Sequence, residues 1–374
     1  MTVRQMEAIA STSGKNVGAK PRIVWVDIAR GMAICLVVLH HSVVAVRQVG
    51  EIGETASLAN GLVKDMRMPL FFFCSGLLAS WGIAKPWTTV LMNQGLVLVW
   101  LILLWTVLHA ALQQIIPVNP WAPPPDPRFL FITPYMNLWF IYAILLLTLL
   151  MRALTARRIV TQIVVILALN VPFVLAYRTF EDSLINSPAG LKLLVDNLAT
   201  YAILYFAAGC WFAPIILALF RTKRRIIVLF PLAVLVWCAE LARADIPAID
   251  FHLPRIIAGI PDVFLGLATA ALLSLWGPTR VIFAWLGTRT LEIFLFHSVL
   301  VGLAFMLIEP LGITSAGAAL LLLFGFGLVG SIAAEQVTRL ARLNFLFRPP
   351  ERVREYARSL LATKWPRRVG PQHL

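Results

Sequence analysis

Charged side chains are scarce in this chain of 374 residues. They make up 13% of the sequence, whereas soluble globular domains carry about 25%. Hydrophobic residues make up 60%, and the mean hydropathy is +0.83. The composition excludes an ordinary soluble enzyme and predicts a protein that crosses a membrane several times, because spanning helices need long apolar runs.

Acidic side chains are scarcer than basic ones. The chain has 18 Asp and Glu against 32 Lys and Arg, which gives a net charge of +14. A strongly basic balance is also typical of nucleic-acid-binding proteins. However, the sequence has no basic patch interleaved with aromatic residues, and its basic residues cluster in short loops and at the two ends. This distribution is typical of cytoplasmic loops in membrane proteins, so we expect no nucleic-acid partner.

Paired cysteines and internal repeats are also missing. The four cysteines lie within apolar runs and have no CxxC spacing: Cys35, Cys74, Cys210 and Cys238. Isolated thiols of this kind usually behave as small buried hydrophobes, so we expect neither disulfides nor a metal site. The absence of a visible repeat argues against the many secondary transporters that are built from two related halves.

Ten segments approach the length of about 20 apolar residues that a membrane span requires. They are residues 28–47, 68–84, 89–114, 136–152, 159–177, 198–220, 226–242, 256–276, 290–308 and 314–336. With a cytoplasmic N-terminus, the inner loops contain basic residues and no acidic ones, whereas the outer loops mix both signs. These inner loops are 85–88, 152–158, 221–225 and 277–289. The partition predicts an all-α, polytopic integral membrane bundle of about ten helices with both termini in the cytoplasm.

Three parts follow from this partition. We expect a cytoplasmic N-terminal segment over residues 1–22, a transmembrane domain over residues 23–338 and a basic cytoplasmic tail over residues 339–374. The first span is expected to act as an uncleaved signal-anchor. The basic tail is expected to contact the anionic membrane lipids of the inner leaflet.

The first apolar segment carries ionisable residues on one face. Arg30 and His41 are eleven positions apart, which is close to three turns of about 3.6 residues. Their side chains therefore differ by only ~20° of rotation, and Asp27 lies within ~40° of His41. The side chain of His40 points about 100° away from that of His41 around the helix, which favours a structural role for His40. Ionisable groups at membrane depth usually serve a function, although Arg30 in isolation is also compatible with snorkelling to lipid phosphates.

Three further segments contain polar residues within apolar helices. The second span follows Arg67 and includes Ser75. The alternative role of Arg67 is that of a cation at the membrane interface, and the alternative role of Ser75 is to allow close helix packing. In the fourth span, Trp139 and Tyr142 share one face, which is also typical of an aromatic belt. The ninth contains Glu292 and His297, about 140° apart on a helix. Both cannot point at one small site, and an ion pair of Glu292 with Arg289 is the alternative role of the carboxylate.

Together these segments resemble acyltransferase family 3, the membrane-bound O-acyltransferases of bacterial glycans, including fucose 4-O-acetylase-like enzymes. The family's first helix typically carries Asp-x-x-Arg-Gly and an Arg-x10-His signature, which Arg30 and His41 match and His40 does not. Residues 67–76 look like its second-helix motif, with Cys74 where an aliphatic residue is more usual. Residues 138–140 and 291–297 resemble further family segments in the expected order. The resemblance extends from residue 22 to about residue 335.

The resemblance implies an O-acetyltransferase of the bacterial inner membrane. It would transfer an acyl group, most simply acetyl, from acyl-CoA to a hydroxyl of a sugar, exopolysaccharide, lipopolysaccharide or related cell-envelope acceptor. Acyl-CoA would be a co-substrate, and no cofactor is expected. His41 would be the general base, because an imidazole titrates near neutral pH.

The remaining residues are assigned supporting roles under the same resemblance. Arg30 would bind the CoA phosphates or orient the thioester, and Asp27 would hold Arg30. Glu292 or His297 would tune or relay the proton. Substrate binding is expected of four residues: Arg67, Ser75, Trp139 and Tyr142. The sequence leaves open whether the acyl group passes directly or through an acyl-histidine.

A second class of protein fits part of the pattern. A transporter or flippase of a lipid-linked sugar or small anion would use the same charged stripe as a substrate or proton path. The missing repeats and the motif match favour the enzyme. A purely structural scaffold would leave the stripe unexplained.

Overall fold

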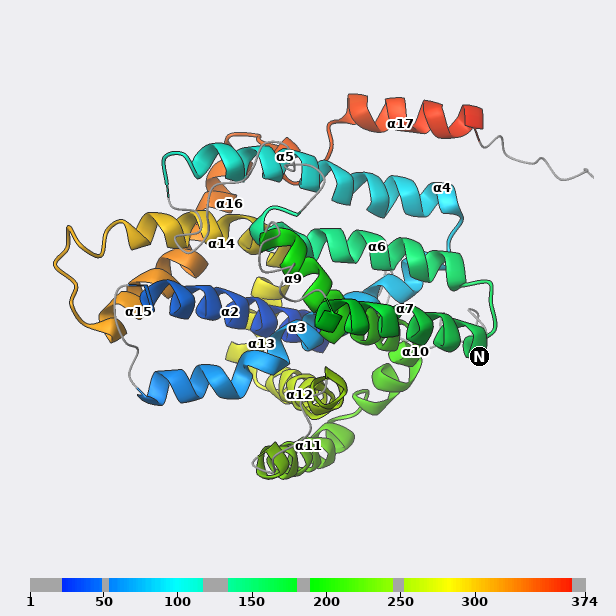
Figure 1. The fold of residues 1–374 in the computed structure, drawn as a ribbon, viewed down its shortest axis with the longest axis horizontal. Helices are drawn as coiled ribbons and strands as arrows, with labels where there is room; N and C mark the ends of the chain where they lie inside the picture. Colours follow the sequence, from blue (N-terminus) through cyan, green and yellow to red (C-terminus); the bar gives the residue numbers. More distant parts are fainter. Residues whose placement is uncertain (1–21, 49–53, 117–133, 180–188, 245–251, 365–374) are drawn as a thin grey trace, which may run out of the picture.

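The computed structural model describes residues 22–48, 54–116, 134–179, 189–244 and 252–364. Within these ranges the chain forms helices joined by short turns, and no strand is present (Figure 1). The predicted all-α class is therefore confirmed. Most of the predicted N-terminal segment, 1–22, and the end of the predicted tail lie outside the described residues.

The helices follow one another along the whole described chain. In order they are α2 (Val24–Val46), α3 (Glu54–Ile83), α4 (Trp87–Val90), α5 (Leu96–Leu112), α6 (Trp139–Leu154), α7 (Ile159–Thr179), α9 (Ala189–Asn197), α10 (Ile203–Leu219), α11 (Lys223–Ala244), α12 (His252–Leu273), α13 (Gly277–Gly287), α14 (Thr290–Phe305), α15 (Ala316–Gly325), α16 (Ser331–Leu340) and α17 (Glu351–Lys364). The π-helical turns η1 (Leu91–Gly95), η4 (Leu198–Ala202) and η5 (Phe326–Gly330) each join two of these helices into one longer run. Two short 3-10 turns, η3 (Met136–Leu138) and η6 (Asn344–Leu346), precede α6 and α17.

Five helical segments have the length and hydropathy of a membrane span. They are Val24–Val46, Met66–Ile83, Trp87–Leu112, Leu194–Leu219 and Ala316–Leu340. Helices α13 and α14 form a sixth if this pair, bent by 76°, is one span. Helices also occupy the other predicted spans, but the count of ten and the cytoplasmic side of both termini stay predictions.

One predicted inner loop is a helix. Residues 277–289 were expected to be a loop because Arg280 and Arg289 lie in them, yet the structure forms α13 over Gly277–Gly287. Pro278 at the start suits the first turn of a helix, and the residues between the two arginines are mostly apolar. The prediction of a loop was wrong because it weighted the flanking charges above this apolar run.

Helix α13 packs closely against α2 through two glycines. A side chain on Gly31 would collide with the backbone carbonyl of Phe283, and one on Gly287 would collide with the carbonyl of Asp27. Small residues allow membrane helices to approach in this way. The contact fixes the segment of α2 that carries Asp27 and Arg30 against the start of α14.

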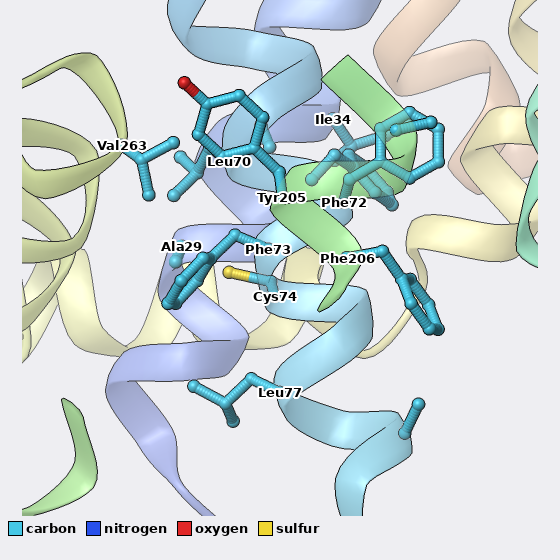
Figure 2. Close-up of a cluster of buried hydrophobic side chains, with 14 of the residues drawn as sticks. Ala29, Ile34, Leu70, Phe72, Phe73, Cys74, Leu77, Tyr205, Phe206 and Val263 are labelled. Atoms are coloured by element: carbon cyan, nitrogen blue, oxygen red, sulfur yellow. The ribbon is translucent and has the colours of Figure 1, made fainter. Parts of the chain in front are cut away.

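The same device joins α3 to α10. Gly76 lies against the carbonyl of Phe206, and Gly209 lies against the carbonyl of Phe73. Around this contact, buried apolar side chains of α3 pack against those of α2, α10 and α12 (Figure 2). They include Ala29, Ile34, Leu70, Phe72, Phe73, Cys74, Leu77, Tyr205, Phe206 and Val263. Helix α3 is thus held at the centre of the bundle.

The C-terminal segment returns to α5. The indole N–H groups of Trp100 and Trp105 donate to the carbonyls of Phe345 and Leu346, at 2.6 and 2.7 Å. Helix α17 then lies along one edge of the bundle, beside α4, and contacts η1 (Figure 1).

Candidate active site

Two imidazoles from different helices meet inside the bundle. His41 on α2 and His297 on α14 have ring centroids 5.1 Å apart. His40 contacts the edge of the His41 ring at 5.4 Å, and no His40–His297 ring contact is recorded among the described residues. Of the two adjacent histidines on α2, His41 is therefore the one whose ring contacts the second histidine.

The hydrogen bonds of His297 define its protonation. Its Nδ1 lies 2.6 Å from the carbonyl oxygen of Phe294 and 3.2 Å from that of Ile293. Because both neighbours are acceptors, Nδ1 carries the proton and donates. The other nitrogen, Nε2, then holds a lone pair that faces the interior.

Two buried polar side chains surround that lone pair. The amide Nδ2 of Asn137 lies 3.5 Å from Nε2 of His297, and the hydroxyl of Ser298 lies 3.4 Å from it. Asn137 also donates to the Ser298 hydroxyl. Such a fully buried polar network fixes the orientation of its members. Neither Asn137 nor Ser298 is among the site residues predicted from the sequence.

His41 borders a small cavity, which we call the His41 cavity. Its volume is about 30 Å³, enough for roughly one or two waters. It is lined by Val37, His41, Met68, Phe71, Asn137, Trp139, Phe140 and Phe294. The lining is apolar except for the imidazole, the amide and the indole, which is typical of a small-ligand site with few polar groups.

A second cavity, the Arg30 cavity, lies next to it. Its volume is about 130 Å³, and its lining includes Arg30, Ser75 and Thr290. Arg30 donates from Nη2 to the hydroxyl of Thr290 at 2.6 Å. Both Arg30 and His41 therefore face α14, which confirms that they share one face of α2.

Asp27 interacts with two cations. Its carboxylate lies 4.0 Å from Arg30 and 2.7 Å from Arg22. The predicted contact with Arg30 is present, but the shorter ion pair is with Arg22, which is also held by the carbonyl of Ala284.

Three phenylalanines separate the two cavities. Phe71, Phe140 and Phe294 line both of them. Phe140 contacts Phe71 edge-to-face at 4.9 Å and Phe294 at 5.4 Å between ring centroids. We call these three residues the aromatic partition. A ligand that extends from Arg30 to His41 must pass between these rings.

A third and larger cavity adjoins the Arg30 cavity. Its volume is about 250 Å³. Ser75, Leu98 and Ile144 line both this cavity and the Arg30 cavity. The three cavities are therefore neighbours in one row, and their volume decreases toward His41.

The other predicted substrate-binding residues are distributed unevenly. Trp139 lines the His41 cavity, and Arg67 is within electrostatic range of His40 and His41. Ser75 lines the two larger cavities but not the His41 cavity. Tyr142 lines none of the three, and its hydroxyl lies near Thr106. Its predicted role is therefore not supported by this geometry.

Glu292 lies away from the imidazole pair. Arg289, the alternative ion-pair partner of Glu292, forms a salt bridge with Glu335 on α16, at 3.4 Å. Glu335 is also paired with Arg339. Glu292 faces this cluster and lines none of the three cavities. Of the two candidates on α14, His297 is the one that the fold brings to His41.

Among the described residues, no group of three or more His, Cys, Asp and Glu side chains is placed to hold a metal ion. The available chemistry is that of two imidazoles, a guanidinium and several amide and hydroxyl groups, which lie in or beside a row of cavities inside a helical membrane protein. Such groups suit proton transfer to or from a bound hydroxyl.

The family comparison agrees with the motifs. The family described as an acyltransferase domain matches residues 23–336. The chain belongs to acyltransferase family 3. Searches of curated proteins and of solved structures found no match. The match includes α2 and α14 and therefore both histidines of the site.

Proposed function

We propose that the protein transfers an acetyl group from acetyl-CoA to a hydroxyl of a sugar, exopolysaccharide, lipopolysaccharide or related cell-envelope glycan in the bacterial inner membrane. The observation that carries this proposal is the contact of His41 with His297 at the narrow end of a row of cavities that also holds Arg30. Membership of an acyltransferase family supplies the reaction type.

His41 is the proposed general base. The acceptor hydroxyl gives its proton to the His41 imidazole while its oxygen forms a bond to the thioester carbonyl carbon. The carbon–sulfur bond then breaks, and the CoA sulfur takes the proton from the imidazolium and leaves as a thiol. His297 packs against the His41 ring, and Asn137 and Ser298 fix the orientation of His297.

The size of the His41 cavity supports a small acyl group. A volume of about 30 Å³ between aromatic walls suits a two-carbon unit better than a longer chain. Beyond His41, Asn137 and Trp139, its lining side chains are apolar, so a carboxylate-bearing acyl group such as succinyl would find no cation in the wall.

The proposed transfer is tested with membranes that contain the protein. They are given acetyl-CoA labelled in the acetyl group and a periplasmic glycan extract, and label in the glycan is counted. We expect transfer by the native protein and a loss of about 10²–10⁴-fold in His41→Ala, the usual range for a general base. His40→Ala is the matched control and should lose far less.

Two results would count against the proposal. Full transfer by His41→Ala would show that His41 is not the general base. Absence of transfer by the native protein, together with uptake of a labelled lipid-linked sugar across the membrane, would instead support a transporter or flippase.

A further inference from the structure

The largest of the three cavities is lined by neutral polar groups. Its wall combines Ser75, Asn93, Gln94 and Thr148 with Leu78, Ala79, Val97, Leu98, Ile144 and Phe206. None of these side chains is ionisable, so the wall offers hydrogen bonds without charge. We call this space the Gln94 cavity.

Gln94 is placed there by a break in the helical pattern. It lies in the π-helical turn η1, between α4 and α5, next to Asn93. Extra-residue turns of this kind frequently occur at functional sites. On the facing helix α3, Gly82 leaves room for the amide, because a Cβ at Gly82 would lie 2.6 Å from Nε2 of Gln94.

The carbonyl oxygen of Gln94 has no partner. Oε1 is buried and accepts no hydrogen bond within the described part of the chain. A buried acceptor without a donor is costly. Oε1 is closed to solvent in this conformation, so a ligand's N–H or O–H removes that cost once the Gln94 side chain rotates to present Oε1 to the cavity. The side chain thus has the properties of an unfilled binding group.

The chemistry of the wall selects the kind of ligand. A phosphate or carboxylate would find no cation among the lining residues, and a purely apolar chain would offer no hydrogen bond to the Gln94 amide or to the buried Thr148 hydroxyl. A secondary amide fits, because its N–H can donate to Oε1 and its C=O can accept from the amide or hydroxyl groups.

We propose that the Gln94 cavity binds the amide-bearing pantetheine arm of the acyl-CoA donor, with Gln94 as its recognition residue. This inference rests on the proposed function. The shared residues Ser75, Leu98 and Ile144 lead from the Gln94 cavity to the Arg30 cavity. An arm held at Gln94 therefore directs its thioester past Arg30 toward His41, and Arg30 contacts the thioester end rather than the phosphates.

The test compares two donors on the full-length protein in membranes. Acetyl-CoA carries the amides, whereas S-ethyl thioacetate is a thioester without them. In Gln94→Leu we expect the KM for acetyl-CoA to rise about tenfold, the effect of leaving one buried amide unpaired, while kcat/KM for S-ethyl thioacetate changes less than twofold. Gln114→Leu, on an exposed residue just after α5, is the matched control and should change neither value.

Two further variants keep the inference testable if Gln94→Leu does not fold. Gly82→Ala pushes on the Gln94 amide without removing it, and Thr148→Val removes a hydroxyl from the opposite wall. Both should raise the KM for acetyl-CoA selectively, and thermal unfolding in detergent checks that each variant is folded.

The outcomes separate this inference from the proposed function. An unchanged KM for acetyl-CoA in folded Gln94→Leu, or an equal loss with both donors, would overturn the role of Gln94 while acetyl transfer stands. If the native protein transfers acetyl from neither donor, the proposed function fails and the inference fails with it.

Discussion

The two ends of the row of cavities differ in size and in chemistry. The His41 cavity has about 30 Å³, aromatic walls and, in its lining, the His41 imidazole that contacts His297. The Gln94 cavity has about 250 Å³ and neutral amides and hydroxyls in its wall. Groups that can move a proton are thus confined to the narrow end, and groups that can only donate or accept hydrogen bonds line the wide end.

This difference separates recognition from chemistry along one path. A large neutral cavity tolerates a long, flexible arm, whereas a tight aromatic cavity holds one small group near the base. Substitutions at the wide end should therefore act mainly on KM for the donor, and substitutions at the narrow end mainly on kcat.

The largest expected effect concerns the imidazole pair. His41→Ala and His297→Ala should each lower kcat by about 10²–10⁴-fold, because each removes part of one proton-transferring unit. The double variant should be no worse than the poorer single variant, since residues that act as a unit are not additive. The measurement is acetyl transfer by membranes with matched protein content.

An additive double variant would show that the two histidines act independently. That result would show that the two rings, although 5.1 Å apart, do not act together in catalysis. His297 would then have a structural role.

Arg30 lies between the two ends and should show an intermediate effect. Arg30→Lys loses the planar fork that reaches Thr290 at 2.6 Å. We expect a loss of roughly 10–100-fold in kcat/KM for acetyl-CoA, the range for a hydrogen bond from a charged group. Thr290→Val, which removes only the partner hydroxyl, should cost less. Equal activity of Arg30→Lys and the native protein would remove Arg30 from the donor path.

The charged stripe could be predicted from the sequence because it depends on one element. Helix α2 is continuous from Val24 to Val46, so a period of about 3.6 residues places Arg30 and His41 correctly. The choice between Glu292 and His297 required the neighbours of α14: Glu335 on α16 marks one face, and His41 on α2 marks the other.

The cavities could not be predicted in this way. Their walls come from α2, α3, α5, α6, α10, α14, η1 and η3, and which faces meet depends on how these elements pack. Asn137 and Gln94 gave a weak signal, as amides within apolar segments, but periodicity alone does not show that they border a cavity. Helix α13 was missed because charge patterns mark loops only where the sequence between the charges is polar.

The aromatic partition offers a smaller effect, on selectivity rather than on rate. Phe140→Ala removes the ring shared by the His41 and Arg30 cavities. We expect the ratio of kcat/KM for butyryl-CoA to that for acetyl-CoA to rise about tenfold, because one or two methylene groups in an apolar pocket carry discrimination of that order. Phe212→Ala, on an exposed ring of α10, is the matched control. An unchanged ratio in Phe140→Ala would show that the aromatic partition does not set the selectivity for the length of the acyl group.

The smallest expected effect concerns the glycines that hold the donor side together. Gly31→Ala forces a methyl group into the carbonyl of Phe283, and overpacking of this kind costs about 1–3 kcal/mol. Gly61→Ala adds the same methyl group within α3 where nothing lies within 4 Å, and it should stabilise by about 0.5–1 kcal/mol because Ala is the better helix former. Thermal unfolding of the purified protein in detergent should therefore shift in opposite directions for the two variants. Equal unfolding temperatures for Gly31→Ala and Gly61→Ala would contradict the close contact of α2 with α13 at Gly31.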